Sequence, residues 1–225
     1  LPFAPSIIGS TKIIEGDFDD CLKMMVRDVE EEYKRKADRG YYVDYSKTRT
    51  VKEEEAPLIY LAGVGRYRDD AEDVFAKRKE ICKKYGLTVV TPMDQAPGVE
   101  KIETDNPYIW ASNVFDNYQQ HVRNCDVIIA DLNDYRGYEV NNDVGFECGM
   151  GFQLGKKLYG YMKDTSPLVE RIPHLGEERE FREHTGSNVE NFNYPCNLMF
   201  SCSMKIFEGE FEKIIQQVAK DLEGK

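Results

Sequence analysis

The sequence has no excess of basic residues. Its 225 residues carry 30 Lys and Arg against 41 Asp and Glu, which gives a formal net charge of -11. Nucleic-acid surfaces and proteins that bind anionic membranes depend on positively charged patches. The charge balance therefore argues against both kinds of partner, whereas a small uncharged ligand would not be repelled.

Long apolar runs are also missing. No stretch approaches the roughly 20 apolar residues that a membrane-spanning helix needs. The first residues, LPFAPSIIG, lack the basic region and apolar core of a signal peptide. We therefore expect a soluble, cytoplasmic protein that does not interact with membranes.

Metal-ligand spacings are absent as well. His121, His174 and His184 are scattered, and none of the six cysteines forms a CxxC pair. Several cysteines lie inside apolar runs, which is typical of reduced, buried thiols. We expect no zinc site.

From residue 57 onward the sequence alternates short apolar runs with helical patterns. The apolar runs predict strands at 58–63, 87–91, 125–132, 157–162 and 204–207, and the helical spacing predicts helices at 71–85, 111–122, 145–155 and 211–222. This alternation predicts an α/β fold: a doubly wound, flavodoxin- or Rossmann-like, five-stranded parallel sheet with helices on both faces. In such sheets ligands bind beyond the carboxyl ends of the strands.

Residues 163–195 interrupt this alternation. The stretch is polar and contains Pro167, Pro173, Gly176 and Gly186. A loop of this length inside a compact domain is usually a lid, a binding loop or a partner contact. A simple surface insertion is an equal alternative.

The first 56 residues form a separate N-terminal extension, and residues 57–225 form the main domain. Apolar residues between Phe18 and Val29 predict one amphipathic helix, followed by a polar linker. A gap-free alignment of residues 2–30 with residues 195–223 sets KIIEGDF on KIFEGEF. Either two amphipathic helices are similar by chance, or the extension is the tail of a preceding, duplicated domain.

Five segments follow one another in a defined order along the main domain. They are IYLAG at 59–63; ICKKYGL at 81–87 with PMD at 92–94; NCDVIIADL at 124–132 with RG at 136–137; FECG at 146–149 leading to LGKK at 154–157; and PCNLM at 195–199. Together they resemble the nucleoside 2-deoxyribosyltransferase family, from residue 58 to about residue 222. The ordered set, rather than any one segment, makes the resemblance specific.

The resemblance implies a pentosyltransferase that exchanges the base of a deoxynucleoside, with Glu147 as the nucleophile. Exchange at a glycosidic carbon with retention needs a carboxylate that forms a covalent sugar–enzyme intermediate. Glu147 follows Gly145 near the expected start of a helix, where the positive end of the dipole favours an ionised carboxylate. This chemistry needs neither a metal nor an organic cofactor.

The expected proton donor to the leaving base departs from the family pattern. The family commonly has an aspartate six residues before the nucleophile, where this chain has Asn141, which cannot titrate. Asp143 is the candidate to replace it. The family also often has Asn or Asp eight residues before Asp126, where this chain has Tyr118, with Asn117 beside it.

The resemblance also implies several substrate-binding residues. Asn197 would hold the sugar hydroxyl in a neighbouring protomer's site, or is only a turn residue after Pro195. Met199 would line the base pocket, or packs in the core; Asp94 contacts the base, or caps a turn. Tyr60 and Tyr67 are alternatives for orienting Glu147. The full set of substrate-binding candidates is Gly63, Arg66, Tyr67, Asp94, Asn117, Tyr118, Gly137, Asn197 and Met199.

Two other functions remain open. The turn GVGRYR at 63–68 is basic, and Arg66 and Arg68 beside free backbone amides would suit the phosphate of a deoxynucleoside 5'-monophosphate in an N-glycosidase. Surface pairing of these arginines with Asp69 and Asp70 is the alternative. An inactive nucleoside-binding domain is the third reading. The expected partners are a deoxynucleoside, a free nucleobase and further copies of the chain in a homodimer or larger homo-oligomer with shared sites.

Overall fold

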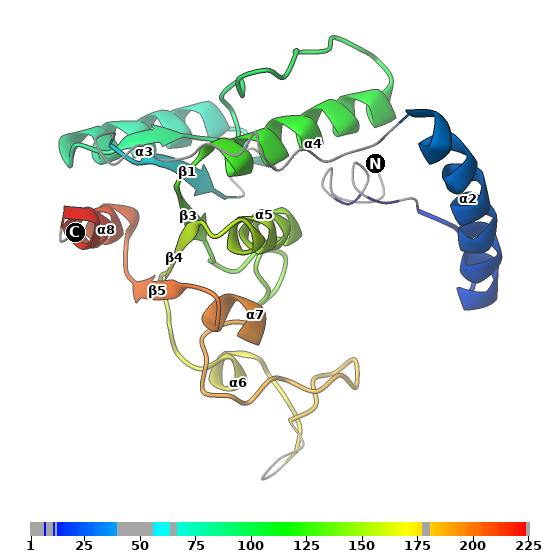
Figure 1. The fold of residues 1–225 in the computed structure, drawn as a ribbon. Helices are drawn as coiled ribbons and strands as arrows, with labels where there is room; N and C mark the ends of the chain where they lie inside the picture. Colours follow the sequence, from blue (N-terminus) through cyan, green and yellow to red (C-terminus); the bar gives the residue numbers. More distant parts are fainter. Residues whose placement is uncertain are drawn as a thin grey trace.

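The computed structural model describes residues 7, 11, 13–39, 56–63, 67–176 and 181–223. Its centre is one sheet of five parallel strands in the order β2-β1-β3-β4-β5 (Figure 1). The strands are β1 (Leu58–Ala62), β2 (Thr88–Val90), β3 (Val127–Asp131), β4 (Lys157–Met162) and β5 (Lys205–Glu208). The predicted five-stranded, doubly wound α/β fold is therefore confirmed.

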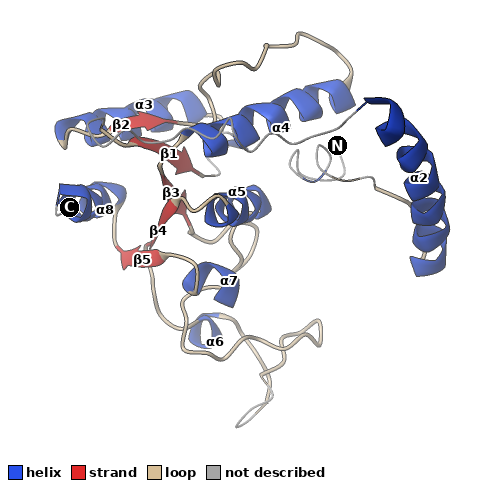
Figure 2. Ribbon diagram, viewed as in Figure 1, coloured by secondary structure: helices blue, strands red, loops and turns tan. Residues whose placement is uncertain are grey.

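Four long helices cover the two faces of the sheet (Figure 2). They are α3 (Ala71–Lys84), α4 (Pro107–Asn124), α5 (Asn142–Gln153) and α8 (Phe211–Glu223). Side chains of α4 and α5 share one core cluster with the sheet, and side chains of α3 and α8 share the other. The helices predicted from apolar periodicity are all present.

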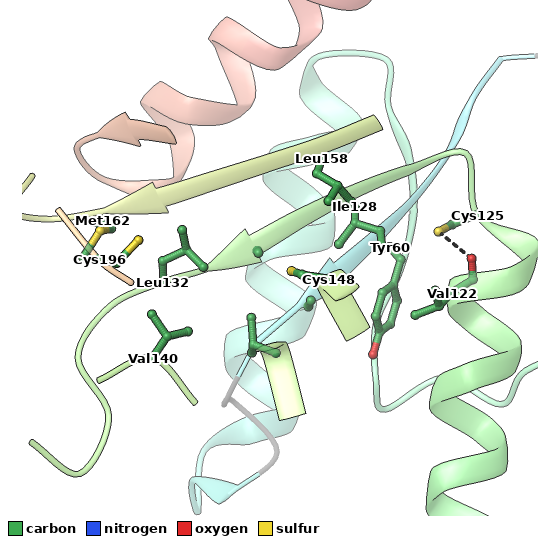
Figure 3. Packing of buried hydrophobic residues seen from close by; sticks show 13 residues of the cluster. Tyr60, Val122, Cys125, Ile128, Leu132, Val140, Cys148, Leu158, Met162 and Cys196 are labelled. Atoms are coloured by element: carbon green, nitrogen blue, oxygen red, sulfur yellow. Dashed lines mark hydrogen bonds between the residues drawn. The ribbon is translucent and has the colours of Figure 1, made fainter. Parts of the chain in front are cut away.

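β3 shows why its sequence is almost continuously apolar. Ile128 and Ala130 belong to the core cluster beneath α4 and α5, whereas Val127 and Ile129 belong to the opposite cluster. A strand that is covered on both faces has no side for water, so alternation disappears. Figure 3 shows Ile128 packed among Leu158, Cys148 and Tyr60.

The polar segment 163–195 has structure of its own. It contains the short helix α6 (Leu168–Arg171), and isolated antiparallel bridges join Leu175 to Arg182 and Arg182 to Asn188. The segment has a small hydrophobic core of its own, formed by Leu168, Ile172 and Val189. Another short helix, α7 (Leu198–Ser201), follows the segment and precedes β5.

The helix expected in the N-terminal extension is present as α2 (Phe18–Arg39). In Figure 1 it lies apart from the sheet and from the helices that cover it. The helix continues beyond Val29 through the charged residues that were expected to belong to the linker, and the rest of that stretch, residues 40–55, lies outside the described residues. Within the described part of the chain, no helix combines the length and apolar character needed to cross a bilayer.

Candidate active site

The candidate residues meet at the beginning of α5. Asn141 is the N-cap of this helix, and its side-chain oxygen accepts hydrogen bonds from the backbone N–H groups of Asp143, at 2.8 Å, and Val144, at 3.4 Å. This cap starts the helix at Asn142 rather than at Gly145. Asp143 therefore lies in the first turn and Glu147 in the second, where the helix dipole acts more weakly than the sequence alone led us to expect.

Glu147 is buried, and a tyrosine from the sheet contacts its carboxylate. The Tyr60 hydroxyl, on β1, donates a hydrogen bond of 2.7 Å to Glu147 Oε1. Burial, and then the negative charge of Glu147, raise the pKa of Tyr60 well above its ordinary value. The hydroxyl therefore remains protonated and able to donate. The sequence left Tyr60 and Tyr67 as alternatives, and the structure brings Tyr60 to Glu147.

Tyr67 contacts Asp143, the other acidic residue of α5 considered for catalysis. Its hydroxyl donates a short hydrogen bond to Asp143 Oδ2, and Asp143 is itself buried. Tyr67 follows the loop after β1, which begins at Gly63. The Gly63 backbone passes close to Arg78 and to Asp131 at the end of β3. Arg66 lies outside the described residues.

A histidine that the sequence did not single out supports Tyr60. The ring of His121, on α4, stacks on Tyr60 with centroids 5.5 Å apart and planes 11° apart. His121 Nε2 lies 2.9 Å from the backbone oxygen of Asp94, so this nitrogen must be the one that carries the proton. Burial lowers the pKa of His121 and favours the neutral ring. Its spacing from other histidines gave no signal, because its partner is aromatic rather than a metal.

Asp94 serves the turn after β2. Its carboxylate accepts hydrogen bonds from Thr91 N–H, at 2.8 Å, and Thr91 Oγ1, at 3.0 Å, and forms a short ion pair with Lys79. Burial alone would raise the pKa of Asp94, but Lys79 and Thr91 outweigh it and lower that pKa. Of the two roles considered from the sequence, the turn cap matches these contacts.

Asn117 and Tyr118 lie on α4 beside the same turn. Asn117 Nδ2 donates to the Asp94 backbone oxygen at 2.9 Å, and its Oδ1 accepts from Ala96 N–H at 2.8 Å. Tyr118 is buried, and it adds a smaller part to the raised pKa of Tyr60 after burial and the charge of Glu147. Gly137 lies in the turn after β3 with φ 116°, a conformation that favours glycine.

Asn197 and Met199 lie at the start of α7, whose Phe200 packs against α5 at Gly145. Asn197 Nδ2 donates to Glu190 Oε1 at 2.7 Å, and its Oδ1 accepts from Met199 N–H at 2.9 Å. Asn197 is therefore the N-cap of α7, which agrees with its reading as a turn residue. Met199 is 72% exposed, so the alternative of core packing was wrong.

The arginine of the turn after β1 forms a surface pair. Arg68 donates to both carboxylate oxygens of Asp70, at 2.6 and 2.9 Å, and both side chains are about half exposed. This is the pairing that competed with phosphate binding in the sequence analysis. It raises the pKa of Arg68 and lowers that of Asp70.

A cavity of about 600 Å³ lies elsewhere, at the carboxyl ends of β3 and β4 beside α3 and α8. Arg68, which was considered for phosphate binding, lines it, whereas Glu147 and Asp143 do not. At its wall Asp131 accepts hydrogen bonds of 2.7 Å from Arg78 and 2.8 Å from Tyr161. Burial would raise the pKa of Asp131, but Arg78 and the surrounding donors lower it. Sequence reasoning missed this buried pair because its partners are far apart along the chain.

Metal-ligand geometry is missing in the part of the chain that the structure describes, where no three His, Cys, Asp or Glu side chains cluster suitably. The carboxylates near β1 instead receive tyrosine hydroxyls. The arrangement offers one buried carboxylate held by a neutral donor, and a second buried carboxylate one helical turn earlier. Two such groups are what covalent glycosyl transfer requires.

Comparisons with known proteins bear on the family and the fold. A family model described as nucleoside 2-deoxyribosyltransferase matches residues 59–199. A 2-desoxiribosyltransferase from Leishmania mexicana is 28% identical, covers 73% of this chain and 97% of its own, and superposes with a TM-score of 0.56. A 2-deoxyribosyltransferase from Bacillus psychrosaccharolyticus is 20% identical and covers 70% of this chain and 90% of its own, with a TM-score of 0.45.

A curated relative of unknown activity matches a shorter region. It is an uncharacterized protein of Schizosaccharomyces pombe, 28% identical over 119 residues, which are 52% of this chain and 56% of the relative. The chain thus spans about half the length of this relative. Because the family model covers more than half of the chain and the fold agrees, the chain belongs to the nucleoside 2-deoxyribosyltransferase family.

Proposed function

We propose that this protein transfers 2-deoxyribose between nucleobases through a covalent glycosyl–Glu147 intermediate. Membership of the family supports a deoxyribosyltransferase or N-glycosidase type of activity. The observation that carries the finer proposal is the 2.7 Å hydrogen bond from Tyr60 to Glu147 Oε1. It fixes the direction of one particular buried carboxylate, as a nucleophile requires.

In the first step a carboxylate oxygen of Glu147 attacks C1' of the deoxynucleoside. The new bond is a glycosyl ester, and the C1'–N bond to the base breaks with its electron pair moving onto the base nitrogen. The Tyr60 hydroxyl holds the carboxylate in place before the attack. Its proton stays on oxygen, because burial and the charge of Glu147 raise the pKa of Tyr60.

The leaving base then needs a proton, and Asp143 is the group that we assign to it. Asp143 is buried one turn before Glu147 on the same helix, and Tyr67 fixes its orientation. Asn141 cannot deliver a proton, and its side chain caps α5 instead. In the second step an acceptor base gives its N–H proton to Asp143 and attacks C1' through that nitrogen, the ester bond breaks and Glu147 regains its charge. The two displacements together retain configuration.

The test replaces Glu147. We expect Glu147→Ala to keep its fold and to lose at least about a thousandfold in kcat, as removal of a nucleophile does. Glu147→Gln, which keeps an oxygen for the Tyr60 hydroxyl, should be equally inactive. Glu72→Ala, at an exposed position in the first turn of α3, is the matched control and should retain activity.

The assay also separates transfer from hydrolysis. Deoxynucleoside, or its 5'-monophosphate, is supplied with and without a second base, and the products are separated by chromatography. New nucleoside that forms only with the acceptor base is expected. Release of deoxyribose or its phosphate whether or not a base is present would replace the transferase by an N-glycosidase. Near-normal turnover of Glu147→Ala would contradict both the transferase and the N-glycosidase proposals.

A further inference from the structure

The helix α2 has an apolar face that the described residues leave bare. Phe18, Leu22, Met25 and Val26 follow helical spacing along one side and are 78%, 41%, 51% and 51% exposed. Removing such side chains from water stabilises a folded protein. Scattered exposed apolar residues are ordinary, but a continuous stripe on one helix indicates a surface that is made to be covered.

The last helix of the chain shows what covers such a face. When residues 2–30 are aligned without gaps on residues 195–223, Phe18 falls on Phe211, and each of these residues is the first of its helix. Gly16 falls on Gly209, and both adopt the left-handed region, with φ 142° and 134°. The similarity therefore extends from the letters of KIIEGDF and KIFEGEF to the backbone turn that starts each helix.

The two helices differ in burial and not in pattern. Cys21, Leu22, Met25 and Val26 of α2 correspond to four residues that α8 buries: Ile214, Ile215, Val218 and Ala219. Ile214, Ile215 and Val218 share one core cluster with Tyr159 and Tyr161 of β4 and with Cys82 of α3. A chance resemblance between amphipathic helices would not reproduce the turn glycine, the helix start and the apolar positions in one register.

Within the described ranges, the residues before α2 also lack the partner that their counterparts before α8 have. Residues 206–208 lie in β5, which pairs with β4. Their counterparts, residues 13–15, belong to no strand among the described residues. The edge of β4 in this domain is already occupied by β5, and its face by α8, so α2 has no place on this sheet.

We propose that residues 13–39 are the final strand and helix of a second domain of this same α/β fold. The apolar face of α2 docks on that domain's equivalents of α3 and β4, and residues 13–15 pair with its fourth strand. The occupant is a preceding copy of the fold in the same polypeptide, joined to residues 57–225 through the linker. The protein is then a tandem of two deoxyribosyltransferase-like domains.

The first test is the coding sequence upstream of Leu1. The proposal expects an open reading frame that encodes four strand–helix units ending in residues 13–39. Hydrogen exchange then compares the amides of 18–39 in that full-length protein and in the 225-residue chain. We expect exchange at least about tenfold slower in the full-length protein, because α8-like packing protects the helix.

Two variants of the full-length protein with the same change in net charge sharpen the test. Leu22→Lys should return the exchange of α2 to the rate of the 225-residue chain, and Asp19→Asn, on the exposed side, should not. A start codon directly before Leu1, an upstream sequence without this fold, or equal exchange in both proteins would overturn the proposal. A dimer of the 225-residue chain that Leu22→Lys dissociates and Asp19→Asn leaves intact would also overturn it. The apolar face of α2 would then be covered by a second copy of this chain.

Discussion

Each of the two acids of α5 accepts a hydrogen bond from a different tyrosine. Tyr60 donates to Glu147, whereas Tyr67 donates to Asp143. A buried carboxylate without donors is costly, and each hydroxyl offsets part of that cost while it fixes the direction of the oxygen that accepts it. The pair of tyrosines therefore gives two similar carboxylates separate surroundings, and so permits separate roles as nucleophile and as proton donor.

Removal of one hydroxyl tests the role of Tyr60 in positioning the nucleophile. We expect Tyr60→Phe to lower kcat at least about tenfold and the free energy of unfolding by about 1–3 kcal/mol, because Glu147 loses a buried donor. Steady-state kinetics and urea denaturation measure the two effects. Tyr135→Phe, whose ring lies beside Tyr67 and not Glu147, is the comparison. An unchanged kcat in Tyr60→Phe would remove this residue from the proposed mechanism.

His121 gives the fold a dependence on pH. Burial lowers its pKa, so below about pH 6.5, the ordinary value, the unfolded chain takes up a proton that the folded chain does not. This contribution to stability is complete above that pH and decreases as the pH falls. The free energy of unfolding, measured by urea titration between pH 7.5 and 5, should decrease more steeply in the native protein than in His121→Gln. His184→Gln, at an exposed position, should keep the native slope.

At the scale of elements, α5 carries both acids. Its own residues determine where the helix starts and how closely it approaches the sheet, and these two features place the acids. Asn141 starts the helix, and Gly151 lets its last turn lie close to β3 and β4. A Cβ on Gly151 would press on Ile128 Cδ1 and lie 3.2 Å from Leu158 Cδ2. The acids thus keep their place because small residues let the helix lie close to the strands.

Two glycines of one helix make a matched pair. Gly151→Ala should lower the free energy of unfolding by about 1–3 kcal/mol, because the added methyl overpacks the contact with β3. Gly149→Ala meets nothing within 4 Å and should raise it by up to about 1 kcal/mol through helix propensity. Thermal and urea unfolding of both variants measure the difference. Equal effects would show that close packing of α5 is not what Gly151 provides.

At the scale of the whole molecule, Asn197 and Met199 lie at the start of α7, where Asn197 donates to Glu190. Met199 is exposed there, although the family resemblance gives it a place in the base pocket. A second protomer that presents α7 to the first would place Asn197 and Met199 in its neighbour's site. We therefore propose that the active assembly is at least a dimer in which each site takes residues from both chains.

The exposed methionine tests this assembly. Met199→Glu should lower kcat/KM by about tenfold or more without lowering the thermal midpoint of the isolated domain, since an exposed side chain adds little to its stability. Phe152→Glu, which changes another exposed apolar residue, is the comparison. Sedimentation measured beside activity shows the size of the active species. A fully active monomer would contradict the shared site.

The sequence by itself determined the strands, the helices, their parallel arrangement and the family, because apolar periodicity and ordered segments are local properties of the chain. It also named Glu147, Asp143 and Tyr60 as candidates. Only the tertiary structure decided which tyrosine meets which acid, that His121 stacks on Tyr60, and that Arg78 pairs with Asp131. Those contacts join residues tens of positions apart, and their partners are chosen by packing of the sheet and helices, which no local pattern records.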